Sequence, residues 1–192
     1  IISSHSQVFG GGEIPLLDNL GRRLAVGDIA VSVNNLISIR EAYLQDLCKI
    51  SESHSIVTDK MPHNFLSIGL IMKAFPEAKV IHVKRDPAAT CWSNFKQYFS
   101  ANGLGYSYDL SDTISYFKMY RDLMAFWEEQ YPNKIYHLDY DELTTQQEPR
   151  IRELIKYVGL DWQDTCLSPH ENSRSVKTAS QLQIRKKIYR GS

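Results

Sequence analysis

The feature that most limits how this chain can fold is a short apolar strand that leads directly into a helix. Residues 78–83 (Ala-Lys-Val-Ile-His-Val) are rich in β-branched side chains, which predicts a buried strand. Arg85 follows, and then Asp86 and Pro87, which are favoured at the N-cap and the first position of a helix. A strand joined to a helix in this way is typical of a parallel sheet with crossover helices.

The same alternation continues on both sides of this segment. We expect further strands at residues 55–59 and 134–139. Helices are expected at residues 38–50, 65–75, 111–130 and 148–158. Residues 10–15, which begin with three glycines, are predicted to form a flexible loop, and residues 1–4 resemble the end of a helix whose start is missing. The pattern predicts a single α/β domain over residues 1–192, with a parallel sheet that helices cover on both faces.

Charge and cysteine content exclude several classes of protein. Basic and acidic side chains are balanced at 22 each, so the chain lacks the overall basic field of proteins that bind nucleic acids or membrane surfaces. The three cysteines form no Cys-x-x-Cys pair, which predicts a reducing, cytoplasmic location and no zinc site. No apolar run approaches the roughly 18 residues of a membrane span. We therefore expect no metal, nucleic-acid or membrane partner, and any anion site must be local.

Arg85 is the first candidate for such a local anion site. Ligands of parallel sheets bind beyond the carboxyl ends of the strands, where helix N-termini point outward. Arg85 lies at that position, and its guanidinium can bind a phosphate with two hydrogen bonds. Ser93 lies about two turns into the following helix and could donate its hydroxyl to the same anion. The spacing alone fits equally well an arginine that pairs with a nearby carboxylate.

The segment from Val80 to Ser93 resembles the 3′-phosphate-binding motif of sulfotransferases that use 3′-phosphoadenosine 5′-phosphosulfate (PAPS), in which a strand ends in Arg-Asp-Pro and a serine follows. Four more segments are similar to motifs of one branch of that family and occur in the same order. The branch contains tyrosylprotein sulfotransferases and bacterial sulfotransferase domains joined to tetratricopeptide repeats. The four segments are Gly12-Glu13-Ile14-Pro15-Leu16, Asp59-Lys60-Met61-Pro62-His63-Asn64-Phe65, Tyr140-Asp141-Glu142-Leu143 and Lys177-Thr178-Ala179-Ser180 with Gln183-Ile184-Arg185. The resemblance implies a P-loop NTPase-like sulfotransferase fold, PAPS as the sulfuryl donor and no metal.

The resemblance also implies catalytic roles. Glu13 matches the catalytic-base glutamate of the tyrosylprotein enzymes, and Lys60 matches a lysine that contacts the transferring sulfuryl group. His63 is the second candidate for the base, because its spacing from Lys60 differs from the family's usual Lys-x-His pattern. Sulfuryl transfer depends mainly on positioning and charge stabilisation, as phosphoryl transfer does. From the residues alone, Glu13 could also be a solvated loop acid.

Other residues would bind the nucleotide by the same resemblance. Arg85 and Ser93 would hold its 3′-phosphate, and Tyr140 would line the adenine pocket. The basic C-terminal segment would close over the nucleotide through Thr178, Ser180, Arg185 and Lys186. Without the resemblance, Tyr140 is as well explained as a buried aromatic residue, and a basic tail is usually solvated. The expected acceptor is a hydroxyl of a peptide tyrosine, a carbohydrate or a small molecule.

One family motif is absent. The family opens with a strand and a Pro-Arg-Ser-Gly-Thr-Thr-like loop that holds the 5′-phosphosulfate, and no such pattern occurs between Ile1 and Asp59. We therefore expect that the chain lacks this strand and loop, that it stops before the family's last segment, and that residues 1–192 alone transfer sulfate poorly. A vacant strand position would favour association, for example as a homo-oligomer. The runner-up hypotheses are a P-loop-type small-molecule kinase, which would need a Gly-Lys-Ser/Thr loop, and a non-catalytic nucleotide-binding module.

Overall fold

The computed structural model describes residues 1–51, 53–99, 103–172 and 188. These residues form two compact units: the first holds residues 1–78 and 160–172, and the second holds residues 79–159 and 188. Every strand pairing in the described residues is parallel, as predicted. The strands pair in two sheets of two strands each. That the chain forms a single domain stays a prediction.

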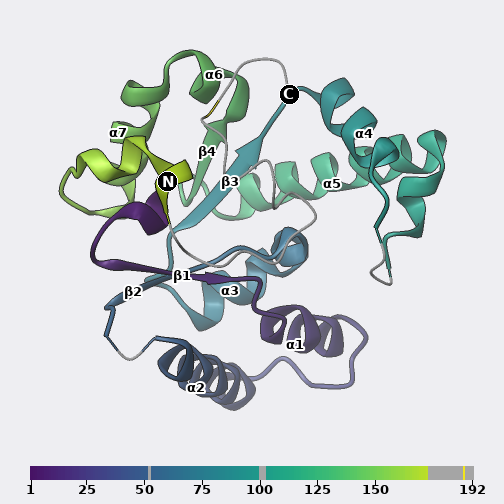
Figure 1. Ribbon diagram of the computed structural model, residues 1–192. Coiled ribbons are helices and arrows are strands. Elements are labelled where there is room, and N and C mark those ends of the chain that lie inside the picture. Colours follow the sequence, from purple (N-terminus) through teal and green to yellow (C-terminus); the bar gives the residue numbers. More distant parts are fainter. Residues whose placement is uncertain (52, 100–102, 173–187, 189–192) are drawn as a thin grey trace. The chain divides into compact units, whose positions relative to one another are not determined.

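The first unit contains a parallel pair of strands, β1 (Val8–Gly12) and β2 (Ile56–Asp59), drawn in purple and blue in Figure 1. Its helices are α1 (Leu16–Ala25), α2 (Val33–Ile50) and α3 (Ile68–Ala74), with short 3-10 helices η1 (Ile2–Ser4), η2 (Pro62–Ser67), η4 (Asp164–Leu167) and η5 (Pro169–Glu171). The hydroxyl of Ser32 caps α2 by accepting a hydrogen bond from the amide of Asn35 (3.2 Å). Helices α1 and α2 provide the long crossover that two parallel strands require.

The helices of this unit bury their apolar sides in one core. Its buried members are Ile14, Leu17, Tyr43, Ala74 and Phe75. The rings of Tyr43 and Phe75 meet edge to face, with centroids 5.0 Å apart. Burying one such large apolar side chain contributes roughly 1.5–3 kcal/mol. Since Ile14 directly follows Glu13, this core anchors the segment that carries the predicted base.

Residues 10–12 of the predicted loop lie in strand β1, so that prediction is wrong for the three glycines, while residues 13–15 connect β1 to α1. A Cβ atom on Gly11 would lie 3.0 Å from the carbonyl oxygen of Thr58, so the close approach of β2 favours glycine here. The strand register shifts just before Gly12, which has a φ of +76°. Gly11 therefore allows close packing of β1 on β2, and Gly12 allows a bulge. The bulge turns the chain out of the strand just before Glu13.

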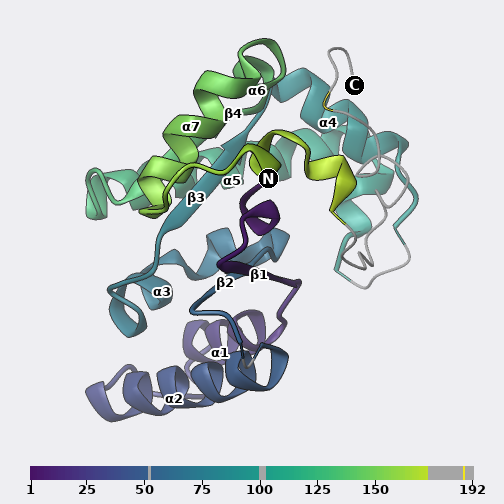
Figure 2. The same ribbon diagram turned by 60° about the vertical axis from the view of Figure 1, so that its left-hand side comes forward.

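The second unit contains strands β3 (Val80–Lys84) and β4 (Ile135–Asp139), which lie side by side in Figure 1 and Figure 2. Its helices are α4 (Pro87–Lys96), α5 (Leu110–Gln130), α6 (Tyr140–Thr145) and α7 (Gln147–Val158), with a 3-10 helix η3 (Gly105–Tyr108). Asp86 caps α4 as predicted, because its carboxylate accepts a hydrogen bond from the amide of Ala89 (2.7 Å). Gly159 ends α7 in the left-handed conformation, with a φ of 88°.

Helices cover both faces of the β3–β4 pair. Tyr157 of α7 stacks on Tyr136 of β4, with ring centroids 4.7 Å apart. Tyr120 of α5 forms a hydrogen bond with His82 of β3, which lies opposite His137 in the strand register. Neighbouring residues of a strand point to opposite faces, so α7 covers the face of Tyr136 and α5 covers the face of His137. The layering expected from the sequence is confirmed in this unit.

Candidate active site and nucleotide half-site

Two of the predicted catalytic residues form an ion pair at the ends of β1 and β2. Glu13 follows β1 and Lys60 follows β2, and the Lys60 Nζ donates a hydrogen bond to the Glu13 Oε1. The backbone amide of Lys60 also donates to the carbonyl oxygen of Gly12 (2.7 Å). Both side chains keep contact with solvent, since 36% of Glu13 and 60% of Lys60 are exposed. The pair thus lies at the carboxyl ends of parallel strands, where such sheets bind ligands.

Asp59, the last residue of β2, organises the residues around this pair. Its Oδ1 accepts a hydrogen bond from the amide of Ile14 (3.3 Å). Its Oδ2 accepts from the hydroxyl of Tyr43 (3.0 Å) and from the Nδ2 of Asn64 (3.2 Å). Burial raises the pKa of Asp59, while these donors and the charge of Lys60 act in the opposite direction. Burial and the Asp59 carboxylate raise the pKa of Tyr43 above its usual range, so Tyr43 remains a donor.

The sequence prediction missed the polar group made by Asp59, Tyr43 and Asn64. A single signal was available, which is a carboxylate at the end of an otherwise apolar strand. Its main partner, Tyr43, lies 16 residues away on another element, and no local pattern links the two positions.

His63, the second candidate for the base, lies half-buried in η2. Within the described residues, no hydrogen bond or ion pair joins it to Glu13 or Lys60. The structure therefore brings the first two predicted catalytic residues together and leaves His63 outside their pair.

Arg85 directly follows β3, as predicted for a residue of an anion site. Its guanidinium carbon lies 5.7 Å from the centre of the Tyr140 ring, and Tyr140 begins α6 immediately after β4. Ser93 lies half-buried in α4, the helix that starts two residues after Arg85. The structure thus brings Arg85 and Tyr140 together at the carboxyl ends of β3 and β4, and it places Ser93 on the adjoining helix.

The N-terminus of α4 contributes less to an anion site than the sequence suggests. The Asp86 carboxylate already accepts the hydrogen bond of the Ala89 amide, and the Asp141 carboxylate accepts one from the Asp86 amide (3.0 Å). Both carboxylates offset the positive end of the helix dipole. A bound phosphate would therefore depend on the guanidinium of Arg85 and on a hydroxyl such as that of Ser93, and not on the first amides of the helix.

Two histidines pair across β3 and β4. The His82 Nδ1 lies 2.9 Å from the His137 Nδ1, and the His137 Nε2 lies 2.9 Å from the Oε2 of Glu128. A carboxylate can only accept, so His137 carries a hydrogen on Nε2. With both rings uncharged, His82 then donates from Nδ1 and accepts at Nε2 from the hydroxyl of Tyr120. Burial, and after it the charges of His137 and Lys84, lower the pKa of His82 to about 4.

We expect the free energy of unfolding to fall between pH 6.5 and about 4 because of His82. The pKa in the folded state lies below the value of 6.5 of an ordinary histidine, so in this window only the unfolded state binds the proton. The contribution of uncharged His82 to the free energy of unfolding is complete above pH 6.5 and is lost as the pH falls to about 4. It amounts to roughly 2 kcal/mol after allowance for solvent screening of a partly exposed ring. Urea unfolding at a series of pH values measures it.

The variant His82→Gln removes this titration and is expected to flatten the pH dependence of the unfolding midpoint. His63→Gln, in the other unit, is the matched control, because it makes the same chemical change away from the His82–His137 pair. An unchanged slope in His82→Gln would show that other groups cause the loss of stability in acid.

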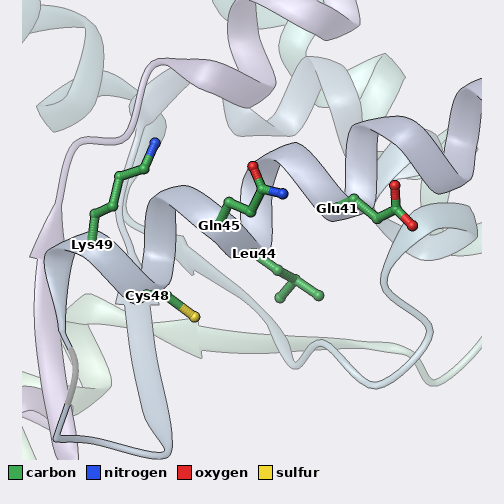
Figure 3. A pocket seen from close by; sticks show the side chains of 5 residues that line it. All are labelled: Glu41, Leu44, Gln45, Cys48 and Lys49. Atoms are coloured by element: carbon green, nitrogen blue, oxygen red, sulfur yellow. The ribbon is translucent and has the colours of Figure 1, made fainter.

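A shallow hollow lies on the outer side of α2 (Figure 3). Its lining residues are Glu41, Leu44, Gln45, Cys48 and Lys49. Figure 3 shows Leu44 and Cys48 pointing to the same side of the helix. All five residues come from one helix, and none follows a strand end or belongs to the predicted site. The hollow is therefore separate from the Glu13–Lys60 pair and is assigned no role.

Four predicted nucleotide-binding residues, Thr178, Ser180, Arg185 and Lys186, lie outside the described residues. In the part of the chain that the structure describes, no three His, Cys, Asp or Glu side chains gather as they would around a metal ion. Within the same ranges, no helix has the length and apolar character needed to cross a membrane.

Comparison with known proteins identifies the family. The model of the sulfotransferase family matches residues 1–164, and the chain therefore belongs to this family. The chain is 36% identical, over its whole length, to a protein of Aquifex aeolicus described as an uncharacterized protein. Over 53% of its length it is 32% identical to the omega-hydroxy-beta-dihydromenaquinone-9 sulfotransferase of Mycobacterium bovis. Over 78% of its length it is 25% identical to the protein-tyrosine sulfotransferase 1 of Danio rerio. The chain spans 27%, 28% and 42% of the lengths of these three relatives.

Proposed function

We propose that this chain carries the catalytic centre of a sulfotransferase that moves a sulfuryl group from PAPS to an acceptor hydroxyl. The observation that carries the proposal is the Glu13–Lys60 ion pair at the carboxyl ends of two parallel strands. The transfer needs a base and a cation side by side, because the acceptor loses a proton while the leaving phosphate gains negative charge. Membership of the sulfotransferase family supports this assignment.

In the proposed reaction the acceptor oxygen attacks the sulfur atom of PAPS. The bond between the sulfur and the bridging phosphate oxygen breaks, and Glu13 takes the proton of the acceptor hydroxyl. Lys60 offsets the negative charge that develops on the bridging oxygen. The products are a sulfate ester and 3′,5′-adenosine bisphosphate. His63 remains the second candidate for the base.

We also propose that Arg85 and Ser93 bind the 3′-phosphate of the nucleotide. The Tyr140 ring supports this role of Arg85, because a guanidinium stacked on an aromatic face loses less freedom when it binds a phosphate. Tyr140 would then lie at the edge of the adenine pocket. Thr178, Ser180, Arg185 and Lys186 are proposed to close over the nucleotide; this list rests on the sequence resemblance alone.

The proposed acceptor is a hydroxyl of a small molecule or of a peptide tyrosine. The names of the mycobacterial and zebrafish relatives describe an omega-hydroxy menaquinone derivative and a protein tyrosine, both of which carry a hydroxyl. Fold-level kinship does not choose between them. The cytoplasmic location expected from the cysteines, and association as a homo-oligomer, stay predictions.

The test is to incubate the full-length protein with labelled PAPS and a panel of hydroxyl acceptors that includes tyrosine peptides and hydroxylated quinones. Transfer of label supports the proposal. Calorimetry with 3′,5′-adenosine bisphosphate runs in parallel, and labelled ATP replaces PAPS in a control arm. Nucleotide binding without transfer would indicate the non-catalytic module, transfer from ATP would indicate a kinase, and neither binding nor transfer would contradict the proposed function.

A further inference from the structure

The end of β2 holds the backbone of Glu13 on both sides. On one side, the carbonyl oxygen of Gly12 accepts a hydrogen bond from the amide of Lys60 (2.7 Å). On the other side, the amide of Ile14 donates to the Oδ1 of Asp59 (3.3 Å). The first contact is between backbone atoms and does not depend on the side chain at residue 60. The second contact depends entirely on the Asp59 carboxylate.

We propose that Asp59 is a positioning residue of this site, whose carboxylate fixes the backbone of Glu13 and so sets the Glu13 carboxylate against the Lys60 ammonium. The inference rests on the proposed function of that pair. Asp59 contacts no reacting atom in the proposed reaction and acts through Glu13. Its own orientation is fixed by the Tyr43 hydroxyl (3.0 Å) and the Asn64 Nδ2 (3.2 Å), which both donate to Oδ2.

The energetics of Asp59 argue against a purely structural role. Burial raises its pKa although three hydrogen bonds and the charge of Lys60 favour the ionised form. The folded state therefore holds an ionised Asp59 less favourably than the unfolded state does, and the carboxylate lowers stability at neutral pH. A neutral side chain of the same shape would avoid this penalty. A charged group that opposes folding is expected where it serves a site.

The variant Asp59→Asn tests the contact sharply, because asparagine has one acceptor oxygen where aspartate has two. In this variant the oxygen can face either the two side-chain donors, Tyr43 and Asn64, or the amide of Ile14. If the NH₂ group faces Ile14, the contact is lost. If the oxygen faces Ile14, the amide bonds to a neutral acceptor, and hydrogen bonds to charged groups are about twice as strong. The substitution therefore keeps the volume of the side chain and weakens the contact that holds Glu13 in either orientation.

We expect Asp59→Asn to lower kcat for sulfuryl transfer about tenfold, with the KM for PAPS changed less than about twofold. In the Glu13→Gln background the same substitution is expected to change kcat little, because the group that Asp59 positions is already lost. The amide hydrogen of Ile14 is expected to exchange faster in Asp59→Asn, because its hydrogen bond is weakened. The parent protein, the two single variants and the double variant form a double-mutant cycle, and steady-state kinetics are measured for all four. Hydrogen exchange is measured for the parent and for Asp59→Asn.

The matched control is Asp46→Asn, which makes the same chemical change in an exposed pair with Lys49 on α2 (2.8 Å). It is expected to keep the parent kcat and the parent exchange rate at Ile14. An equal loss of kcat in both Glu13 backgrounds would show a general structural effect and overturn the inference. Unchanged kcat and unchanged Ile14 exchange in Asp59→Asn would also overturn it.

Failure of the proposed function gives a different result. It would show as absent transfer in the parent protein, or as full activity in Glu13→Gln. In either case the exchange rate of the Ile14 amide, which requires no activity, still decides whether Asp59 fixes this backbone.

Discussion

Lys60→Ala is expected to lower kcat for sulfuryl transfer by about 10²–10³-fold, because the leaving phosphate loses a positive charge held beside it. Removing one such preorganised group costs roughly 3 kcal/mol of transition-state stabilisation. The Lys60 Nζ also bonds to the carboxylate of Glu13, so the proposed base loses its partner in the same variant. The proposed 3′-phosphate contacts of Arg85 do not involve Lys60, so the KM for PAPS is expected to change less than kcat. Steady-state kinetics of the full-length protein measure both constants.

Lys49→Ala is the matched control for this prediction. Lys49 pairs with Asp46 (2.8 Å) on the exposed side of α2, and its removal is expected to leave kcat unchanged. Lys60→Arg keeps the charge and loses the compact ammonium, so an intermediate rate is expected. Parent-like kcat in Lys60→Ala would mean that the Glu13–Lys60 pair is not the catalytic centre.

Three of the four strands in the described residues, and most of the helices, could be predicted because their signals are local. Strand β1 was not predicted, because its glycines are typical of a loop. The Asp86-Pro87 start of α4 and the Gly159 end of α7 are cap residues that act on their own helix. Helices α1 (Leu16–Ala25) and α6 (Tyr140–Thr145) were not predicted. Gly21 lowers the helix propensity of α1. In the structure, a Cβ atom on Gly21 would lie 2.3 Å from the Oγ of Ser67, so a larger residue here would displace the Ser67 side chain, and the packing of α1 on η2 favours glycine. The sequence contains no sign of that contact.

Part of the site, the residues Glu13 and Lys60, was predicted from the resemblance to the family and not from a local sequence pattern. Glu13 and Lys60 are 47 residues apart, and their contact depends on the parallel register of β1 and β2 and on the bulge at Gly12. Neither the register nor the bulge can be read from the residues alone. Asp59 was missed for the same reason, because its role arises from donors on three separate segments of the chain, such as Tyr43 of α2.

Arg85→Ala is expected to weaken the binding of 3′,5′-adenosine bisphosphate by at least about 100-fold. A guanidinium can donate two charge-assisted hydrogen bonds to a phosphate, and each contributes about 1.5–3 kcal/mol. The first amides of α4 are not expected to replace them, because Asp86 already accepts the hydrogen bond of the Ala89 amide (2.7 Å). Adenosine 5′-monophosphate lacks the 3′-phosphate, so its affinity is expected to change less than about threefold. Calorimetry of the full-length protein with each nucleotide measures both effects.

Two further variants distinguish an effect of net charge on nucleotide binding from an effect of direct contact with the nucleotide. Arg121→Ala lowers the net charge equally, but Arg121 lies exposed on α5 beside Asp122 (3.4 Å), so nucleotide binding is expected to be unchanged. Ser93→Ala removes one hydroxyl donor and is expected to weaken the bisphosphate about fivefold. An equal loss of affinity for both nucleotides in Arg85→Ala would show that Arg85 contacts another part of the ligand. Unchanged affinity for both would show that the 3′-phosphate does not bind at the end of β3. The ratio of the two affinities identifies the group that Arg85 binds, because adenine, ribose and the 5′-phosphate are common to both nucleotides.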